Sequence, residues 1–290
     1  MLKQRLIFGS ILIAALAGVF VLDHYTSTTF GFTSLLFVIT AMALYEFYTM
    51  HEIKLQAKLP KYYGIVVGLI IISFPVTLKL VSLYSALYRF ELIPTILGTI
   101  AVLSMPALMI WYLIKGNPAS VQNIYVTLFG LAYVCAPLFF LYTLRALEPL
   151  KFNGETIFYL LIILNKTADS GAYFGGKYLG KHKLSPNISP NKTIEGFICA
   201  LLTGLVVGQL FFSFTSLGQS FSYPIFMILA FVMALSGQAG DLFESMIKRY
   251  CGVKDSGTLF PALGGILDLI DCLLASSFIT FIALSIITNL

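Results

Sequence analysis

A stretch near the end of the chain, residues 240–271, carries the side chains best suited to chemistry. It reads GDLFESMIKRYCGVKDSGTLFPALGGILDLID and mixes acids with bases between two long apolar runs. Its five carboxylates and three cations are Asp241, Glu244, Asp255, Asp268, Asp271, Lys248, Arg249 and Lys254. Charged groups beside a bilayer are costly and are usually retained for chemistry or transport. This stretch is therefore the first candidate for a functional site.

The spacing of these acids predicts a site for a divalent cation. One helical face gathers residues at i, i+3, i+4 and i+7, namely Asp241, Glu244, Ser245 and Lys248. Asp268 and Asp271 share a face of the next helix. Paired carboxylates suit Mg²⁺, which binds oxygen ligands and typically rests on one or two carboxylates plus substrate phosphates. The alternative is salt bridging of the first pair of acids with Lys248 or Arg249, which leaves Asp268 and Asp271 without obvious partners.

A second polar cluster ends the apolar stretch 156–175. Lys166 and Asp169 are three residues apart and share a helical face, and the glycine-rich run SGAYFGGK follows them. One interpretation is a neutralised ion pair that tolerates burial. The other, which we favour because ionisable residues inside membranes are usually functional, is a ligand-binding helix end where small residues let a phosphate or metal approach the backbone. The glycines match neither GxGxxG nor a Walker loop.

The basic loop 177–192 follows this cluster. Its lysines favour either a topology anchor on the inner side of a membrane or a lid that neutralises phosphates. Lys192 and Thr193 lie at the predicted start of a helix, where backbone N–H groups favour anions.

The positioning elements are predicted to be membrane-spanning helices. Of the 290 residues 58% are hydrophobic and only 11% charged, against about 25% charged in soluble domains. Spanning takes about 20 mostly apolar residues. Nine stretches qualify, near 6–22, 29–48, 62–82, 92–114, 122–143, 156–175, 195–216, 223–243 and 263–288. The fold class is thus an all-α polytopic membrane protein of about nine transmembrane helices, in which the first stretch could instead be a cleaved signal peptide.

The distribution of basic residues predicts the orientation. With a cytoplasmic N-terminus, most loop lysines and arginines fall on the cytoplasmic side. The opposite side receives Lys79, Arg89, Arg145 and Lys151. We expect the C-terminus outside, and the polar clusters on the cytoplasmic face. We divide the chain into an N-terminal transmembrane scaffold, residues 1–150, and a C-terminal catalytic region, residues 151–290.

At these residues the chain resembles the phosphatidate cytidylyltransferase (CDP-diacylglycerol synthase) family. The family pattern Ser-x-x-Lys-Arg, spacer, Lys-Asp, then Pro-x-His-Gly-Gly-x-x-Asp-Arg-x-Asp is matched by Ser245, Lys248, Arg249, Lys254, Asp255, Pro261, Gly264, Gly265, Asp268 and Asp271. The segments 169–180 and 189–196 resemble the same family. Two positions depart from the pattern: Leu263 stands where His is usual, and Leu269 where Arg is usual. Either those two side chains are dispensable, or this is a divergent member with altered activity.

The resemblance implies transfer of the cytidylyl group of CTP to phosphatidic acid, with Mg²⁺ and room for a second metal ion. It implies catalytic roles for Lys248, Arg249, Lys254, Asp255 and Asp268. Substrate-binding roles fall to Asp169, Lys177, Lys192, Ser245, Gly264 and Gly265. The metal ligands would be Asp241, Asp255, Asp268 and Asp271.

Two other functions remain open at this point. A CTP-dependent polyprenol or phytol kinase would transfer the γ-phosphoryl group instead, and a cation-coupled transporter would use the charged groups as an ion pathway. The expected partners are CTP, phosphatidic acid and membrane lipids, with a homodimer as a candidate assembly and no nucleic acid. We expect the protein in a bacterial inner membrane, with its active site facing the cytoplasm.

Overall fold

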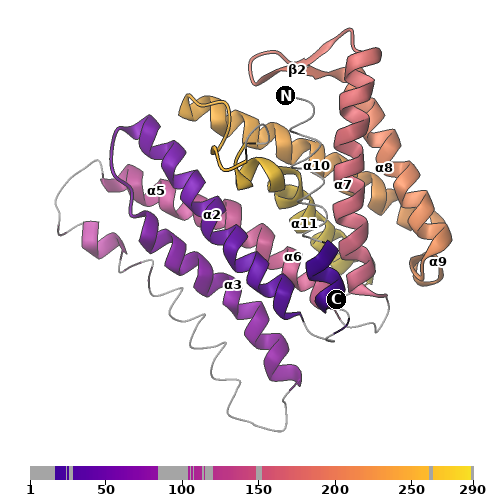
Figure 1. Ribbon diagram of the computed structural model, residues 1–290, viewed down its shortest axis with the longest axis horizontal. Helices are drawn as coiled ribbons and strands as arrows, with labels where there is room; N and C mark the ends of the chain where they lie inside the picture. Colours follow the sequence, from indigo (N-terminus) through magenta and orange to yellow (C-terminus); the bar gives the residue numbers. More distant parts are fainter. Residues whose placement is uncertain are drawn as a thin grey trace. The chain divides into compact units, whose positions relative to one another are not determined.

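A computed structural model describes residues 17–23, 25, 29–83, 104, 106, 108–112, 114, 120–147, 152–260 and 264–288. Its helices are α2 (Phe30–Leu55), α3 (Lys61–Leu83), α5 (Ser120–Gly130), α6 (Ala136–Ala146), α7 (Gly154–Tyr178), α8 (Ile194–Phe214), α9 (Leu217–Ser220), α10 (Tyr223–Cys251) and α11 (Ile266–Thr288) (Figure 1). A π-helical turn, Leu131–Cys135, joins α5 to α6. The strands β1 (Lys183–Ser185) and β2 (Ser189–Thr193) form one antiparallel hairpin.

Within the described residues, five helical segments are long and apolar enough to cross a membrane. They are Phe30–Leu55, Val121–Ala146, Ile194–Phe214, Tyr223–Cys251 and Ile266–Thr288, and they match five of the predicted spans. Helices also form at the predicted spans 62–82 and 156–175, although charged residues interrupt the apolar run of α7. The predicted spans 6–22 and 92–114 lie largely outside the described residues. The protein is a mainly α-helical integral membrane protein.

The chain forms two compact units, and each contains two separate segments of the sequence, unlike the predicted division at residue 150. The first unit comprises Met1–Phe139 and Cys251–Leu269, and the second comprises Phe140–Tyr250 and Ile270–Leu290. The loop after α10 and the first turn of α11 therefore belong with the N-terminal helices. The division of labour between scaffold and catalytic region stays a prediction.

In the first unit, α2 packs closely on α3 and α5 because glycines face its large side chains. A Cβ at Gly64 would collide with the ring of Tyr48, and one at Gly130 would collide with both Tyr48 and Phe47. The Tyr48 hydroxyl donates to the carbonyl of Thr127 at 3.1 Å, which satisfies a buried polar group. This packing holds the end of α2 that carries Glu46.

In the second unit, α7 and α8 lie side by side, with the β-hairpin at the end where α7 stops and α8 starts (Figure 1). Asn153 caps α7 by accepting the N–H of Thr156 at 3.3 Å, and Thr193 caps α8 by accepting the N–H of Gly196 at 3.1 Å. The Asn165 side chain links α7 to α11 by donating to Ser276 Oγ at 3.0 Å. A Cβ at Gly237 would collide with Asn165, so α10 also approaches closely here.

Candidate functional site

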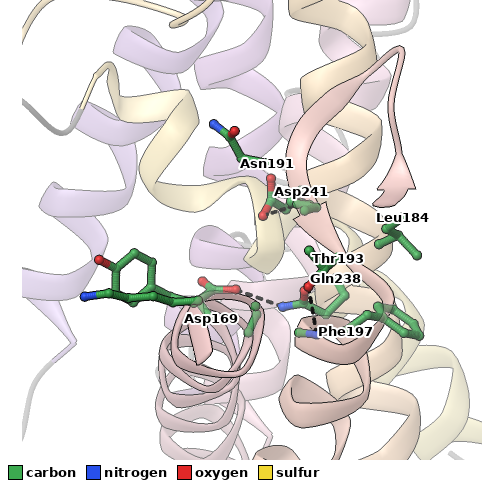
Figure 2. Close-up of a pocket in the computed structure, with 13 residues that line it drawn as sticks. Asp169, Leu184, Asn191, Thr193, Phe197, Gln238 and Asp241 are labelled. Atoms are coloured by element: carbon green, nitrogen blue, oxygen red, sulfur yellow. Dashed lines mark hydrogen bonds and ion pairs between the residues drawn. The ribbon is translucent and has the colours of Figure 1, made fainter. Parts of the chain in front are cut away.

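A cavity of about 440 Å³ opens in the second unit, between the end of α7, the β-hairpin, the start of α8 and the middle of α10 (Figure 2). Its charged lining residues are Asp169, Lys177, Lys192 and Asp241. Two carboxylates and two ammonium groups therefore share one cavity of a size typical for small-molecule sites.

The first turn of α8 borders this cavity, and its backbone N–H groups are engaged within the protein: the N–H of Ile194 donates to the carbonyl of His182 at 2.9 Å. Thr193 and Gly196 line the cavity, and the Thr193 side chain already occupies the N–H of Gly196. Glu195 ties the chain before the hairpin to the helix by accepting the backbone N–H of Lys181 at 3.0 Å and a contact from His182 Nδ1 at 2.6 Å. The helix start is thus held firmly, and its dipole favours an anion in the cavity.

Asp169 is oriented by its neighbours on α10 and α7. Its Oδ1 accepts a hydrogen bond from Gln238 Nε2 at 3.0 Å, which Figure 2 shows as a dashed line. Its Oδ2 lies 3.9 Å from Lys166 Nζ, and the same ammonium donates to Cys272 Sγ on α11 at 3.4 Å. The ion pair between Lys166 and Asp169 that the less favoured interpretation allowed therefore forms, and it belongs to a larger polar cluster beside the cavity.

Asp241 and Asp271 come from neighbouring helices in this unit. Asp241 Oδ2 pairs with Lys192 Nζ of the hairpin at 2.7 Å. A Cβ at Gly240 would lie 2.7 Å from the Asp271 carbonyl oxygen, so α10 and α11 touch at this level. The buried Asp271 interacts electrostatically with Asp241 and with Asp169, while Lys166 offsets part of this negative charge. Three acidic side chains from α7, α10 and α11 thus interact with one another in the second unit, and two of them, Asp169 and Asp241, line the cavity.

The last turns of α10 carry further predicted residues. Lys248 forms an ion pair with Glu244, as the alternative interpretation of this helix allowed, and both side chains are buried. Arg249 Nε donates to the carbonyl of Ile188 in the hairpin turn at 3.2 Å. Ser245 is half-buried on the same helix. The Lys248–Glu244 pair therefore lies within α10, and the Arg249 hydrogen bond joins α10 to the hairpin.

The remaining predicted residues lie in the first unit. Asp268 Oδ2 accepts three hydrogen bonds at 2.8 Å, from the N–H and the hydroxyl of Ser256 and from the N–H of Gly265. Gly264 has φ +91°, a conformation that favours glycine, and pairs with Phe260 through two backbone hydrogen bonds. Lys254 and Asp255 are exposed. Leu263 lies outside the described residues, and Leu269 is the last residue of this unit.

The glycines after Asp169 mainly let α8 pack closely against α7, and they do less to open the backbone to a ligand. A Cβ at Gly171 would collide with Thr203, and one at Gly175 would collide with Cys199, both on α8. Of Gly171, Gly175 and Gly176, Gly176 is the one that lines this cavity. The small residues therefore bring α8 close to α7, and this close packing in turn shapes the cavity wall.

The acidic side chains suit a divalent cation only if the substrate supplies some of the metal ligands. In the part of the chain that the structure describes, no three side chains of His, Cys, Asp or Glu gather as a ready-made metal site. A hard cation such as Mg²⁺ needs only one or two protein carboxylates when substrate phosphates supply other ligands. The oxygen donors of Asp241 and Asp271, in one unit and close to lysines, match that chemistry.

Three residues that the sequence analysis did not single out also belong to these clusters. Gln238 lies one helical turn before Asp241 and is 4% exposed, so it was detectable as a polar neighbour on the same face. Tyr173 lines the cavity beside Lys177. Glu46 is a lone acid in an apolar span, a signal that by itself indicates a functional or structural role.

Comparisons with known proteins agree with the predicted resemblance. A family model described as the cytidylyltransferase family matches residues 3–287. The phosphatidate cytidylyltransferase of Bacillus subtilis (strain 168) is 32% identical over 273 residues, which are 94% of this chain and 94% of that relative. The protein of the same name from Staphylococcus aureus (strain COL) is 40% identical over 174 residues, 59% of this chain and 63% of that relative. Because the family model and the Bacillus relative both cover nearly the whole chain, the protein belongs to the cytidylyltransferase family.

Proposed function

We propose that the protein transfers the cytidylyl group of CTP to phosphatidic acid, releasing CDP-diacylglycerol and pyrophosphate for phospholipid biosynthesis. A phosphate oxygen of phosphatidic acid attacks the α-phosphorus of CTP, and the bond from that phosphorus to the oxygen bridging to the β-phosphate breaks. A phosphomonoester is already a competent nucleophile. Catalysis therefore depends on alignment and on charge stabilisation at the phosphates.

The observation that carries this proposal is the charge arrangement around the cavity of the second unit. Lys177 and Lys192 supply positive charge, and the dipole of α8 adds to it at the start of that helix, which suits phosphate oxygens. Asp169 and Asp241 supply oxygen ligands in the same cavity. A triphosphate needs both kinds of group, because its own charge requires cations and its usual metal partner requires carboxylates. The aromatic ring of Tyr173 adds an apolar wall.

Mg²⁺ is the metal we propose, with Asp241 and Asp271 as its protein ligands and Asp255 and Asp268 as the remaining candidates. When bound, the metal would neutralise phosphate charge and orient the reacting groups. Lys192 would exchange its pairing with Asp241 for a phosphate oxygen. Gln238 would keep the Asp169 carboxylate facing the cavity.

We also propose the membrane arrangement that the basic residues favour. The nine spans would place the N-terminus in the cytoplasm and the C-terminus outside, so that the lysine-rich hairpin and the cavity face the cytoplasm of a bacterial cell. Phosphatidic acid would enter sideways between helices, with its acyl chains left in the bilayer. A homodimer remains the candidate assembly.

Product analysis tests the proposal against a lipid kinase. Purified protein in detergent receives phosphatidic acid together with a polyprenol, Mg²⁺ and CTP labelled at the α-phosphate. We expect the label to enter the lipid while unlabelled pyrophosphate appears in equal amount. Label remaining in CDP, with an unlabelled phosphorylated lipid, would show phosphoryl transfer and overturn the proposal.

A further inference from the structure

Glu46 is a buried acid in the otherwise apolar helix α2, and it is fully occupied by partners. It is 8% exposed. Its Oε1 accepts the N–H of Ile266 at 2.9 Å, and its Oε2 accepts the N–H of Leu267 at 2.9 Å. These are the first two residues of α11, so Glu46 caps that helix from another element. A buried carboxylate is tolerated where such donors and a helix N-terminus stabilise its charge.

The loop before α11 is built closely around this carboxylate. Ser256 Oγ lies 2.9 Å from Glu46 Oε2. A Cβ at Gly257 would lie 2.6 Å from Glu46 Oε1, and one at Gly265 would collide with the same carboxylate and with Ser256. Because the backbone approaches Glu46 where a side chain would block it, the loop conformation depends on this acid.

Ser256 connects Glu46 to Asp268. Its hydroxyl lies between the two acids and shares its one proton between Glu46 Oε2 at 2.9 Å and Asp268 Oδ2 at 2.8 Å, and its backbone N–H donates to Asp268 Oδ2 at 2.8 Å. The backbone N–H of Asp268 in turn donates to Ser256 Oγ at 3.3 Å. The position of Asp268 is thus determined by the loop that Glu46 holds, although 222 residues separate the two acids in the numbering.

We propose that Glu46 is a positioning residue for the cytidylyl transfer: it holds the start of α11 and, through Ser256, the carboxylate of Asp268. This inference rests on the proposed function, because it assumes that Asp268 takes part in that reaction. Glu46 itself touches no substrate. Its contribution is to keep the first turn of α11, and the acid on it, in one orientation.

The test compares Glu46→Gln with Glu52→Gln, which makes the same change six residues further along α2. Glu52 pairs with Lys61 at 2.6 Å and accepts the N–H of Leu59, so its carboxylate binds the start of α3 and the loop before it. In Glu46→Gln an amide NH₂ must face one of the two helix N–H groups. Displacement of a reacting group by about an ångström can lower rates about 100-fold. We therefore expect kcat to fall about 100-fold in Glu46→Gln with KM for CTP within about threefold, and both to stay near parental values in Glu52→Gln.

Hydrogen exchange at the amides of Ile266 and Leu267 supplies a readout that does not depend on activity. We expect faster exchange there in Glu46→Gln and unchanged exchange in Glu52→Gln. If Glu46→Gln does not fold, Ser256→Ala replaces it, since this change removes only the connecting hydroxyl, and we expect about a tenfold loss of kcat. An active parental protein with full kcat in these variants would overturn the positioning role, whereas a parental protein that makes no CDP-diacylglycerol would instead overturn the proposed function.

Discussion

Replacing Lys192 with methionine tests how the cavity handles phosphate charge. Lys192 Nζ lies 2.7 Å from Asp241 Oδ2, and the two side chains are 23% and 27% exposed. Exposed ion pairs contribute about 0–1 kcal/mol, and breaking a buried pair costs about 3–5 kcal/mol. With both side chains only about a quarter exposed, we expect Lys192→Met to lower the free energy of unfolding by about 1–2 kcal/mol.

The effect on activity should be larger than the effect on folding. A hydrogen bond to a charged partner contributes about 1.5–3 kcal/mol, so losing the contact to a triphosphate oxygen should lower kcat/KM for CTP about 10- to 150-fold. Initial rates of CDP-diacylglycerol formation at varied CTP, in detergent at fixed phosphatidic acid, measure this. Lys192→Arg should stay within about tenfold of the parental value, because it keeps the charge.

Lys181→Met is the matched control, because Lys181 is exposed just before the same hairpin and donates its backbone N–H, which the substitution keeps, to Glu195. It should leave kcat/KM unchanged. If Lys192→Met retained kcat/KM within twofold of the parental protein, Lys192 would not contact the substrate phosphates, and the reasoning about this cavity would fail.

Three further predictions concern the metal, the α7–α10 contact and the helix packing. Chelation with EDTA should abolish lipid product formation and excess Mg²⁺ should restore it; activity that persists in EDTA would exclude a required divalent cation. Gln238→Glu places a second carboxylate where the amide now donates to Asp169 at 3.0 Å, so kcat/KM should fall about tenfold or more, and an unchanged value would show that this contact is not needed. Gly196→Ala would bring a Cβ within 2.7 Å of the Ala172 carbonyl oxygen, so it should destabilise the protein by about 1–3 kcal/mol in thermal unfolding; an unchanged midpoint would mean that α7 and α8 can move apart at no cost.

Local sequence patterns predicted the helices and part of the site. Long apolar runs are sufficient to indicate spans, and the spacing of Asp241, Glu244 and Lys248 correctly indicated a shared helical face. The same spacing admitted the Glu244–Lys248 ion pair as an alternative, and the structure has that pair. Residue identity alone therefore located the charged region without deciding which partner each charge takes.

The hairpin was not predicted because its strands lack the usual signals. The strand Ser189–Thr193 reads SPNKT, with a proline and no alternation of apolar and polar residues. Its conformation depends on tertiary partners: Glu195 holds its base, and Arg249 holds its turn. The pairing of Lys192 with Asp241 follows from that hairpin and could not be read from either residue.

Glu46 shows the same limit for contacts distant in the sequence. Its partners Ser256 and Ile266 lie 210 and 220 positions away, and no local pattern connects them. A lone acid in an apolar span was the available signal, and it indicates importance without naming a partner.

The most direct measurement of the central claim is the turnover of purified Asp271→Asn with CTP, Mg²⁺ and phosphatidic acid. The substitution keeps the shape of the side chain and replaces one carboxylate oxygen, a proposed metal ligand, with an amide nitrogen. If acids from α10 and α11 organise the transfer, the rate of CDP-diacylglycerol formation should fall about 100-fold or more, with unfolding close to that of the parental protein. A folded Asp271→Asn protein that turns over near the parental rate would contradict the account.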